Sequence, residues 1–243
     1  EWDIDSLNFD SDNPANDLVA NCANGTIKFL HIAGEDPVHS YYKGAEIKNA
    51  LQIVPFLVVQ DVYMTETAKL ADIVLPTTTS VEKEGSFTNM TRHVQKVVPS
   101  TPPQFQSRTD HEIFVQLAEV FGKKLKSSSV FEVQEEILKT VPTYKGTLPG
   151  TNSRQWSPEG FKHTPCFQIS DAPQVVKRKK EFPFQLVSNN HMFHIGSYTQ
   201  YAKALTDIGP ECIAELHPED AQTLGVNDGD RIMIESSTYK VEV

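Results

Sequence analysis

Residues 53–76 read IVPFLVVQDVYMTETAKLADIVLP, which is an apolar run, a polar segment and a second apolar run. Residues 53–59 are almost wholly apolar, as is typical of a strand that is covered on both faces. Residues 65–71 predict a short helix, and residues 72–76 predict another brief buried strand. A strand, a helix and a strand in this order indicate a parallel sheet with covering helices.

The same alternation extends toward the N-terminus. Residues 26–33 form another short apolar run, and the turn-forming residues 34–37 interrupt it. Residues 40–51 then predict a helix. The first half of the chain is therefore expected to fold as an α/β domain with a Rossmann-like parallel sheet.

The middle of the chain predicts a helical segment. Thr109 and Glu112 have the spacing of a capping box, and Ser129 and Glu132 repeat that spacing. From residue 145 to about residue 183 the periodicity disappears, and Pro, Gly, Ser and Asn dominate. Irregular segments of this length are uncommon inside a compact domain, so we expect a crossover between two domains.

The last part of the chain has the pattern of a β domain. Residues 184–187 predict a strand, His217 opens a short helix, and residues 231–235 and 239–243 predict paired strands. We expect this region to be part of a C-terminal β-barrel. Because the last strand ends at the final residue and the chain does not begin with Met, we also expect a chain truncated at both ends. The expected domains are residues 1–145 (α/β with a helical end), residues 146–182 (crossover linker) and residues 183–243 (partial β-barrel).

Composition restricts the partners and the location. Lys and Arg number 22 and Asp and Glu number 32, so the formal net charge of −10 repels phosphate backbones and nucleic acid is not an expected partner. No apolar run reaches the roughly 20 residues of a membrane span, and no signal peptide is present, so direct membrane insertion is not expected. The scattered cysteines lack C-x-x-C spacing, which predicts no local metal site and fits a reducing, cytoplasmic location. They are Cys22, Cys166 and Cys212.

Polar residues gather where two of the predicted strands end. Gly34 lets a phosphate or a ring approach the main chain, although residues 34–37 also suit an ordinary β-turn. Gln60 and Asp61 follow the most apolar run, and a carboxylate at this position can accept two N–H bonds from a guanine edge. Thr65 can bind phosphate or cap the next helix, and both interpretations stay open.

Two later motifs also offer binding groups. In residues 82–95, Gly85 permits a tight backbone and Arg92 provides a fork for phosphate or carboxylate, but the same residues suit a surface loop. Residues 191–199 combine small residues with hydrogen-bond donors that can grip a polar ring system. The alternative for this segment is a strand with two satisfied histidines.

In this order, the motifs resemble the molybdopterin oxidoreductase family, which includes formate dehydrogenases, nitrate reductases and the large iron–sulfur subunit of respiratory complex I. The resemblance covers nearly the whole chain and is weakest over residues 127–182. It rests on Val58-Val59-Gln60-Asp61, Thr65-Glu66-Thr67-Ala68, Ala71-Asp72-Ile73-Val74-Leu75-Pro76, Glu82-x-Glu84-Gly85-Ser86-Phe87-Thr88-Asn89, Arg92-x-x-Gln95 and His217-Pro218-Glu219-Asp220-Ala221.

The resemblance implies a molybdopterin guanine dinucleotide held between α/β domains and a C-terminal barrel. The family's metal-binding Cys or selenocysteine and its iron–sulfur cysteines would lie upstream of residue 1, so no catalytic or metal-binding residue is implied in this chain. The residues implied along the dinucleotide are Gly34, Glu35, Asp36, Pro37, Gln60, Asp61, Thr65, Gly85, Arg92 and Asp110, and those implied near the pterin are His194, Gly196, Ser197 and Thr199.

The chain departs from the family's pattern at the pterin end. Many members carry basic residues on both sides of a His-x-Gly-Thr block, whereas this chain has Asn189, Asn190 and then Gln200 or Tyr201 at those places. The family resemblance associates such losses with the complex I branch, where the similar domain usually lacks the cofactor. Residues 194–205 also look more like that branch.

We therefore expect a scaffold, namely part of the large iron–sulfur subunit (G type) of an NADH–quinone oxidoreductase with a degenerate cofactor site. It would assemble with other redox subunits, peripherally on the inner face of a membrane. The alternative is the cofactor-embracing half of a molybdenum or tungsten oxidoreductase such as formate dehydrogenase. A nucleotide-binding module unrelated to redox chemistry is a third interpretation, because a Rossmann-like shape alone does not fix function.

Overall fold

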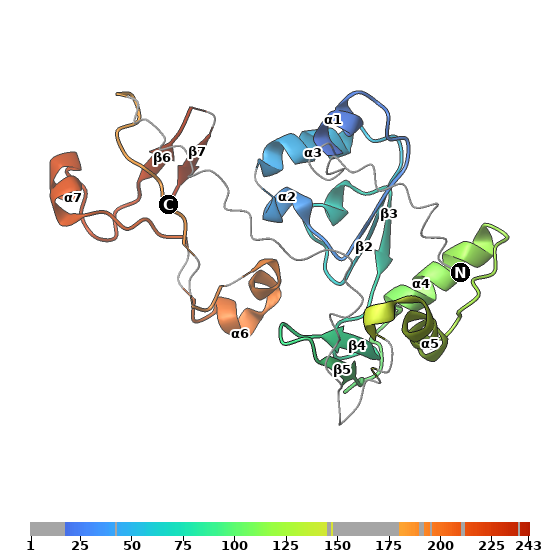
Figure 1. Cartoon of the computed structure of the whole chain (residues 1–243). Coiled ribbons are helices and arrows are strands. Elements are labelled where there is room, and N and C mark those ends of the chain that lie inside the picture. The colour runs from blue at the N-terminus through green and yellow to red at the C-terminus, as the bar shows by residue number, and fades with distance from the viewer. Residues whose placement is uncertain are drawn as a thin grey trace. The chain divides into compact units, whose positions relative to one another are not determined.

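The computed structural model describes residues 18–41, 43–144, 147, 180–189, 192–194, 196–209, 212–237 and 239–243 (Figure 1). The chain divides into two compact units, Glu1–Cys166 and Phe167–Val243, and each is described by itself. Most of the predicted crossover lies outside the described residues, and the predicted domain boundaries stay predictions.

The first unit is built on a three-stranded parallel sheet of order β1-β2-β3. Its strands are β1 (Leu30–Ala33), β2 (Leu57–Asp61) and β3 (Ile73–Pro76). Every residue of the central strand β2 is buried, as its apolar sequence predicts. The predicted α/β class with a parallel sheet is confirmed. The strand begins later than the apolar run does, because Ile53 still caps the preceding helix and is 55% exposed.

Helices α1 (Leu18–Ala23), α2 (Pro37–Ser40) and α3 (Gly44–Gln52) cover one face of the sheet (Figure 1). The helix predicted over residues 40–51 is present as α3, which begins at Gly44, whereas α2 begins at Pro37, at the end of the segment that was predicted as a turn. Between β2 and β3 the predicted short helix is reduced to the 3₁₀ turn η2 (Ala68–Leu70). The core on this face consists of Ile32, Ile47, Leu51, Leu57, Val59 and Ala68.

The other side of the sheet carries α4 (Asp110–Val120), and α5 (Val130–Thr140) follows it. The Phe114 ring of α4 packs against His31 of β1 with 5.7 Å between ring centroids. Both helices begin at the predicted capping boxes, which are confirmed. The start of α4 is also tied to the end of β3, because Arg108 pairs with Thr77 and its carbonyl accepts from the Thr78 N–H at 3.1 Å.

We expect Thr109→Ala to lower the free energy of unfolding by about 1 kcal/mol, because its hydroxyl caps the Glu112 N–H and the Glu112 carboxylate accepts from the Thr109 N–H. Urea unfolding of the whole chain measures this loss. Glu119→Ala is the control, since it removes an exposed side chain from the last turn of the same helix and is expected to change stability by less than about 0.5 kcal/mol. Equal losses in the two variants would contradict the capping argument.

The sequence interpretation missed a hairpin. Strands β4 (Gly85–Thr88) and β5 (Val94–Val97) pair antiparallel where a loop was one of the open alternatives. The Asn89 side-chain oxygen accepts from the His93 N–H, and Arg92 has a φ of 68° in the connecting turn. The side-chain amide thus replaces a backbone contact in the turn, which is common for Asn.

The second unit contains small elements. They are η5 (Ser197–Tyr201), α6 (Lys203–Thr206), α7 (Pro218–Leu224), β6 (Met233–Glu235) and β7 (Lys240–Glu242). The predicted helix after His217 and the predicted pairing of the last two strands are confirmed. The strand predicted over residues 184–187 is wrong, and no closed barrel is found among the described residues of this unit, so the barrel stays a prediction. Throughout the described part of the chain, no helix is long and apolar enough to cross a bilayer.

Candidate functional site

The carboxyl ends of β1 and β2 lie side by side and form one edge of the sheet. Ala33 pairs with Gln60, and the Gly34 N–H donates to the Gln60 carbonyl at 2.8 Å. Gly34 has a φ of 67°, a conformation that favours glycine, and a Cβ at this position would meet no atom within 4 Å. The main chain is therefore open to a ligand at the point where ligands bind in parallel α/β sheets.

Asp36 follows this turn, and its two carboxylate oxygens have different environments. Its Oδ1 accepts from the Thr67 N–H at 3.1 Å and from the Thr67 hydroxyl at 2.5 Å. Its Oδ2 is buried and has no hydrogen-bond partner. Thr67 in turn accepts from the Val38 N–H at 3.2 Å, which holds the start of α2 against η2. One carboxylate oxygen thus fixes the local fold, while the other is an unused acceptor.

Gln60 belongs to a polar network beneath the start of α4. Its Nε2 donates to Asp110 Oδ1 at 2.7 Å, and Asp110 also accepts from the Thr77 hydroxyl at 2.8 Å and from Lys83 Nζ at 2.6 Å. Burial alone would raise the pKa of Asp110, but these three donors outweigh it and lower the pKa below its ordinary value. The Gln60 side chain is fully buried, and its Oε1 has no partner.

Asp61 ends strand β2 and is only 3% exposed. Its burial raises the pKa of the carboxyl above the ordinary value, although the N–H groups of Val62 and Tyr63 act in the opposite direction. The carboxylates of Asp36 and Asp110 add to the increase by repulsion. Asp61 is therefore a carboxylate whose negative charge is poorly compensated by the surrounding protein.

Most of the residues predicted along the dinucleotide lie near the carboxyl ends of β1 and β2 or at the start of α4. Their exposure and their hydrogen bonds differ. Glu35 is exposed, whereas Pro37 is buried as the first residue of α2. The Thr65 hydroxyl accepts from the N–H of Ala68, the first residue of η2, at 3.1 Å, and its contact with a phosphate stays a prediction. The open main chain lies at Gly34, and the unpaired acceptors belong to Asp36 and Gln60. The polar network joins Gln60 to Asp110, and the buried carboxylate is that of Asp61.

Gly85 and Arg92 lie on the β4–β5 hairpin. No ion pair of the Arg92 guanidinium is found among the described residues. Sequence reasoning passed over Thr77 and Lys83, both of which hold Asp110. Lys83 lies within the motif of residues 82–89, and this position was the signal in the sequence that could have marked it as a site residue.

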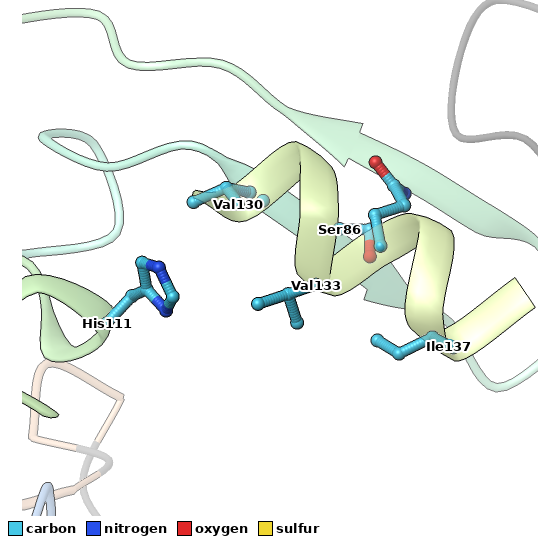
Figure 2. A pocket seen from close by; sticks show the side chains of 7 residues that line it. Ser86, His111, Val130, Val133 and Ile137 are labelled. Carbon is cyan, nitrogen blue, oxygen red and sulfur yellow. The ribbon is translucent and has the colours of Figure 1, made fainter. Parts of the chain in front are cut away.

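A cavity of about 200 Å³ lies beside Gly85 (Figure 2). His111 of α4 points toward it from one side, and Val133 and Ile137 point into it from α5. The imidazole Nε2 is buried without a partner, but no charged side chain lines the cavity. The cavity therefore offers little to a phosphate. It is lined by Gly85, Ser86, His111, Val130, Val133, Gln134 and Ile137.

In the second unit, the predicted pterin residues form one local cluster. The Thr199 hydroxyl donates to the Gly196 carbonyl at 2.6 Å and lies 2.9 Å from His194 Nδ1. Which of these two atoms donates in the second contact depends on the tautomer of the imidazole. Ser197 begins η5 beside them, whereas Asn190 and His191 lie outside the described residues.

No group of three His, Cys, Asp or Glu side chains in the described ranges is arranged to hold a metal ion. The β1–β2 edge itself carries unpaired hydrogen-bond acceptors, an open main chain at Gly34 and one cation, Lys83, in the Asp110 network.

Two family models match parts of the chain. A family model described as Molybdopterin oxidoreductase matches residues 5–120, and one described as Molydopterin dinucleotide binding domain matches residues 184–243. The first match contains the whole β1–β2 edge and the network around Asp110. The second contains the His194 cluster.

Curated relatives carry two kinds of name. The chain is 33% identical to the F420-dependent formate dehydrogenase 2 subunit alpha of Methanococcus maripaludis, over 90% of this chain and 36% of the relative. It is 30% identical to an NADH-quinone oxidoreductase subunit of the G type (number 2) of Rhizobium meliloti, over 89% of this chain and 25% of the relative. The chain thus spans about a third or less of the length of these relatives.

A solved structure shares the fold. The acetylene hydratase of Pelobacter acetylenicus matches with a TM-score of 0.65 and 20% identity, over 93% of this chain and 36% of that protein.

Proposed function

Because this chain belongs to the molybdopterin oxidoreductase family, we propose that its α/β unit is built as a cradle for the guanine-dinucleotide end of a molybdopterin cofactor at the β1–β2 edge. The observation that carries this proposal is the set of buried acceptors without partners, Asp36 Oδ2 and Gln60 Oε1, beside the poorly compensated Asp61 carboxylate. Leaving such an acceptor unpaired costs about 1–3 kcal/mol, which donors on a ligand would offset.

The residues present fit such a group. Guanine carries N–H donors on one edge, which Asp61 can accept, and the main chain at Gly34 is open to a phosphate or a ring. Arg92 is a further candidate for a phosphate contact. When bound, the molybdenum or tungsten pterin supplies the redox chemistry, and this chain's residues supply binding and orientation.

For the second unit we propose that it is part of a β-barrel and contributes to the pterin end. Gly196, Ser197 and Thr199 provide small and hydroxyl-bearing residues there, and His194 provides an imidazole ring. The remaining predicted contacts, from Glu35, Pro37, Thr65 and Gly85, belong to the proposed dinucleotide cradle on the strength of the family resemblance.

For the parent assembly, the first candidate is a scaffold in an NADH–quinone oxidoreductase. Its specific support is the absence of basic side chains at Asn189, Gln200 and Tyr201, where many family members grip the pterin end. A relative named as the G-type component of that enzyme is consistent with it. In this interpretation the nucleotide end of the cradle is retained and the pterin end is degenerate. The chain would then assemble with other redox subunits, in the cytoplasm and peripherally at a membrane.

The second candidate is the cofactor-holding part of a formate dehydrogenase alpha subunit. Its specific support is the pair of unpaired buried acceptors, Asp36 Oδ2 and Gln60 Oε1, which a bound cofactor would satisfy. Relatives named as formate dehydrogenase alpha subunits are consistent with it.

Two measurements on the natural subunit in its assembly distinguish the candidates. Plasma mass spectrometry quantifies molybdenum and tungsten, and the fluorescence of oxidised pterin quantifies the organic cofactor. Stoichiometric metal and pterin would reject the scaffold. Absence of both would reject the formate dehydrogenase interpretation. Titration of this chain with GMP tests the shared part of the proposal, because failure to bind at millimolar GMP would reject a guanine cradle in either assembly.

A further inference from the structure

We propose that Asp110 and Lys83 are positioning residues that fix the Gln60 amide, so that its carbonyl oxygen, and not its amino group, faces the bound nucleotide. The inference rests on the proposed function, because it concerns the polarity of the guanine-nucleotide cradle. It assigns Asp110 an indirect role, where the sequence pattern implied a direct contact with the cofactor.

The amide orientation follows from the chemistry of its neighbour. Gln60 has one end that donates and one end that accepts, and an ionised carboxylate can only accept. Asp110 Oδ1 lies 2.7 Å from the amide, so the amino group must face Asp110. The carbonyl oxygen Oε1 then points away from Asp110 and is the atom without a partner.

The network keeps Asp110 ionised, as this orientation requires. Lys83 Nζ is 2.6 Å from Asp110 Oδ2, and the Thr77 hydroxyl donates to Oδ1. Asp110 is also the first residue of the 11-residue helix α4, where the helix dipole favours a negative charge. Three donors already occupy this carboxylate, so it has little capacity left for a ligand.

The consequence is a site whose unused atoms are acceptors. Gln60 Oε1 and Asp36 Oδ2 both require a donor from the ligand, and Asp61 adds a carboxylate. If Asp110 did not hold the amide, Gln60 would be free to turn its amino group outward, and one acceptor would become a donor. Asp110 and Lys83 therefore determine which hydrogen-bonding pattern the cradle accepts, without touching the ligand.

A double-mutant cycle on the whole chain tests the inference, with GMP affinity measured by calorimetry. Gln60→Met removes the amide and is expected to weaken GMP binding about tenfold. Asp110→Asn is expected to weaken it by a similar factor, because the Asn amide accepts either orientation of Gln60. In the double variant the affinity is expected to equal that of Gln60→Met alone, because Asp110 acts only through Gln60.

Lys83→Met provides a milder variant if Asp110→Asn does not fold, because the Lys83 side chain is about a third exposed. It too is expected to weaken GMP binding only while Gln60 is present. Lys139→Met removes a lysine in a surface ion pair on α5 and is the control, with no change in affinity expected. If the affinity losses of the two single variants multiplied in the double variant, Asp110 would act independently of Gln60. That result would overturn the inference but not the proposed guanine cradle. No GMP binding by the unmutated chain would overturn the proposed function together with it.

Discussion

Replacing Asp61 with asparagine is expected to weaken GMP binding by the whole chain about 100-fold or more. Two charge-assisted hydrogen bonds from a guanine edge to one carboxylate are each worth about 1.5–3 kcal/mol, and asparagine cannot accept both. Calorimetry with GMP measures the loss. Asp207→Asn is the matched control, because Asp207 is an exposed carboxylate in a surface ion pair with Lys203. An unchanged GMP affinity in Asp61→Asn would exclude Asp61 from the cradle.

The same substitution is expected to make the empty protein more stable at pH 7, by about 0.5–2 kcal/mol. Burial raises the pKa of Asp61, so its ionised form opposes folding. The favourable contribution of this carboxyl is present below its unfolded pKa and is lost as the pH rises through its folded pKa. The advantage of Asp61→Asn is therefore expected to disappear in acid, where the native Asp61 is neutral. Urea unfolding at pH 7 and at about pH 3, which lies below the unfolded pKa of Asp, compares the two proteins.

Residues that favour ligand binding but lower the free energy of unfolding are typical of functional sites. If Asp61→Asn destabilised the chain equally at both pH values, its carboxylate would be a structural acceptor for the Val62 N–H and not a group reserved for a ligand.

Replacing Asp36 with alanine is expected to lower the free energy of unfolding by about 2–4 kcal/mol. Its Oδ1 accepts from both the N–H and the hydroxyl of Thr67, a residue with no exposed surface, and removing it leaves two buried donors unpaired. Chemical unfolding of the whole chain measures the loss. Asp207→Ala, which breaks only a surface ion pair, is expected to cost less than about 1 kcal/mol.

A loss in Asp36→Ala as small as that of the control would mean that Thr67 finds other partners. In that case Asp36 would be retained for its free Oδ2 alone, and only nucleotide binding would change.

The fold of the first unit could be predicted because its signals are local. The apolar run before Gln60 requires cover on both faces, and the Thr109 and Ser129 capping boxes define helix starts within four residues. The second unit was predictable where the same kind of signal exists, as at His217 and Gly225. Residues 184–187 show the limit, because a short apolar stretch specifies a strand only when another strand pairs with it.

The candidate site was only partly predictable. Motif order brought Gly34, Gln60 and Asp61 to the sheet edge, since strands that run parallel end on the same side. The roles of Thr77 and Lys83 could not be read from the sequence, because they depend on packing across more than 25 positions of chain. Our inference gives Asp110 an indirect role, and its predicted direct contact with the dinucleotide stays a prediction.

The bridge between Thr77 and Arg108 has a consequence for local unfolding. The Arg108 N–H donates to the Pro76 carbonyl, and the Arg108 carbonyl accepts from the Thr78 N–H. These two bonds join the residues before α4 to the end of β3. The first turn of α4 cannot leave the sheet without breaking these bonds, and it carries Asp110 with it. We therefore expect opening of this turn and loss of the sheet edge to be one cooperative event in native-state amide exchange, and we expect a ligand at the edge to slow both together.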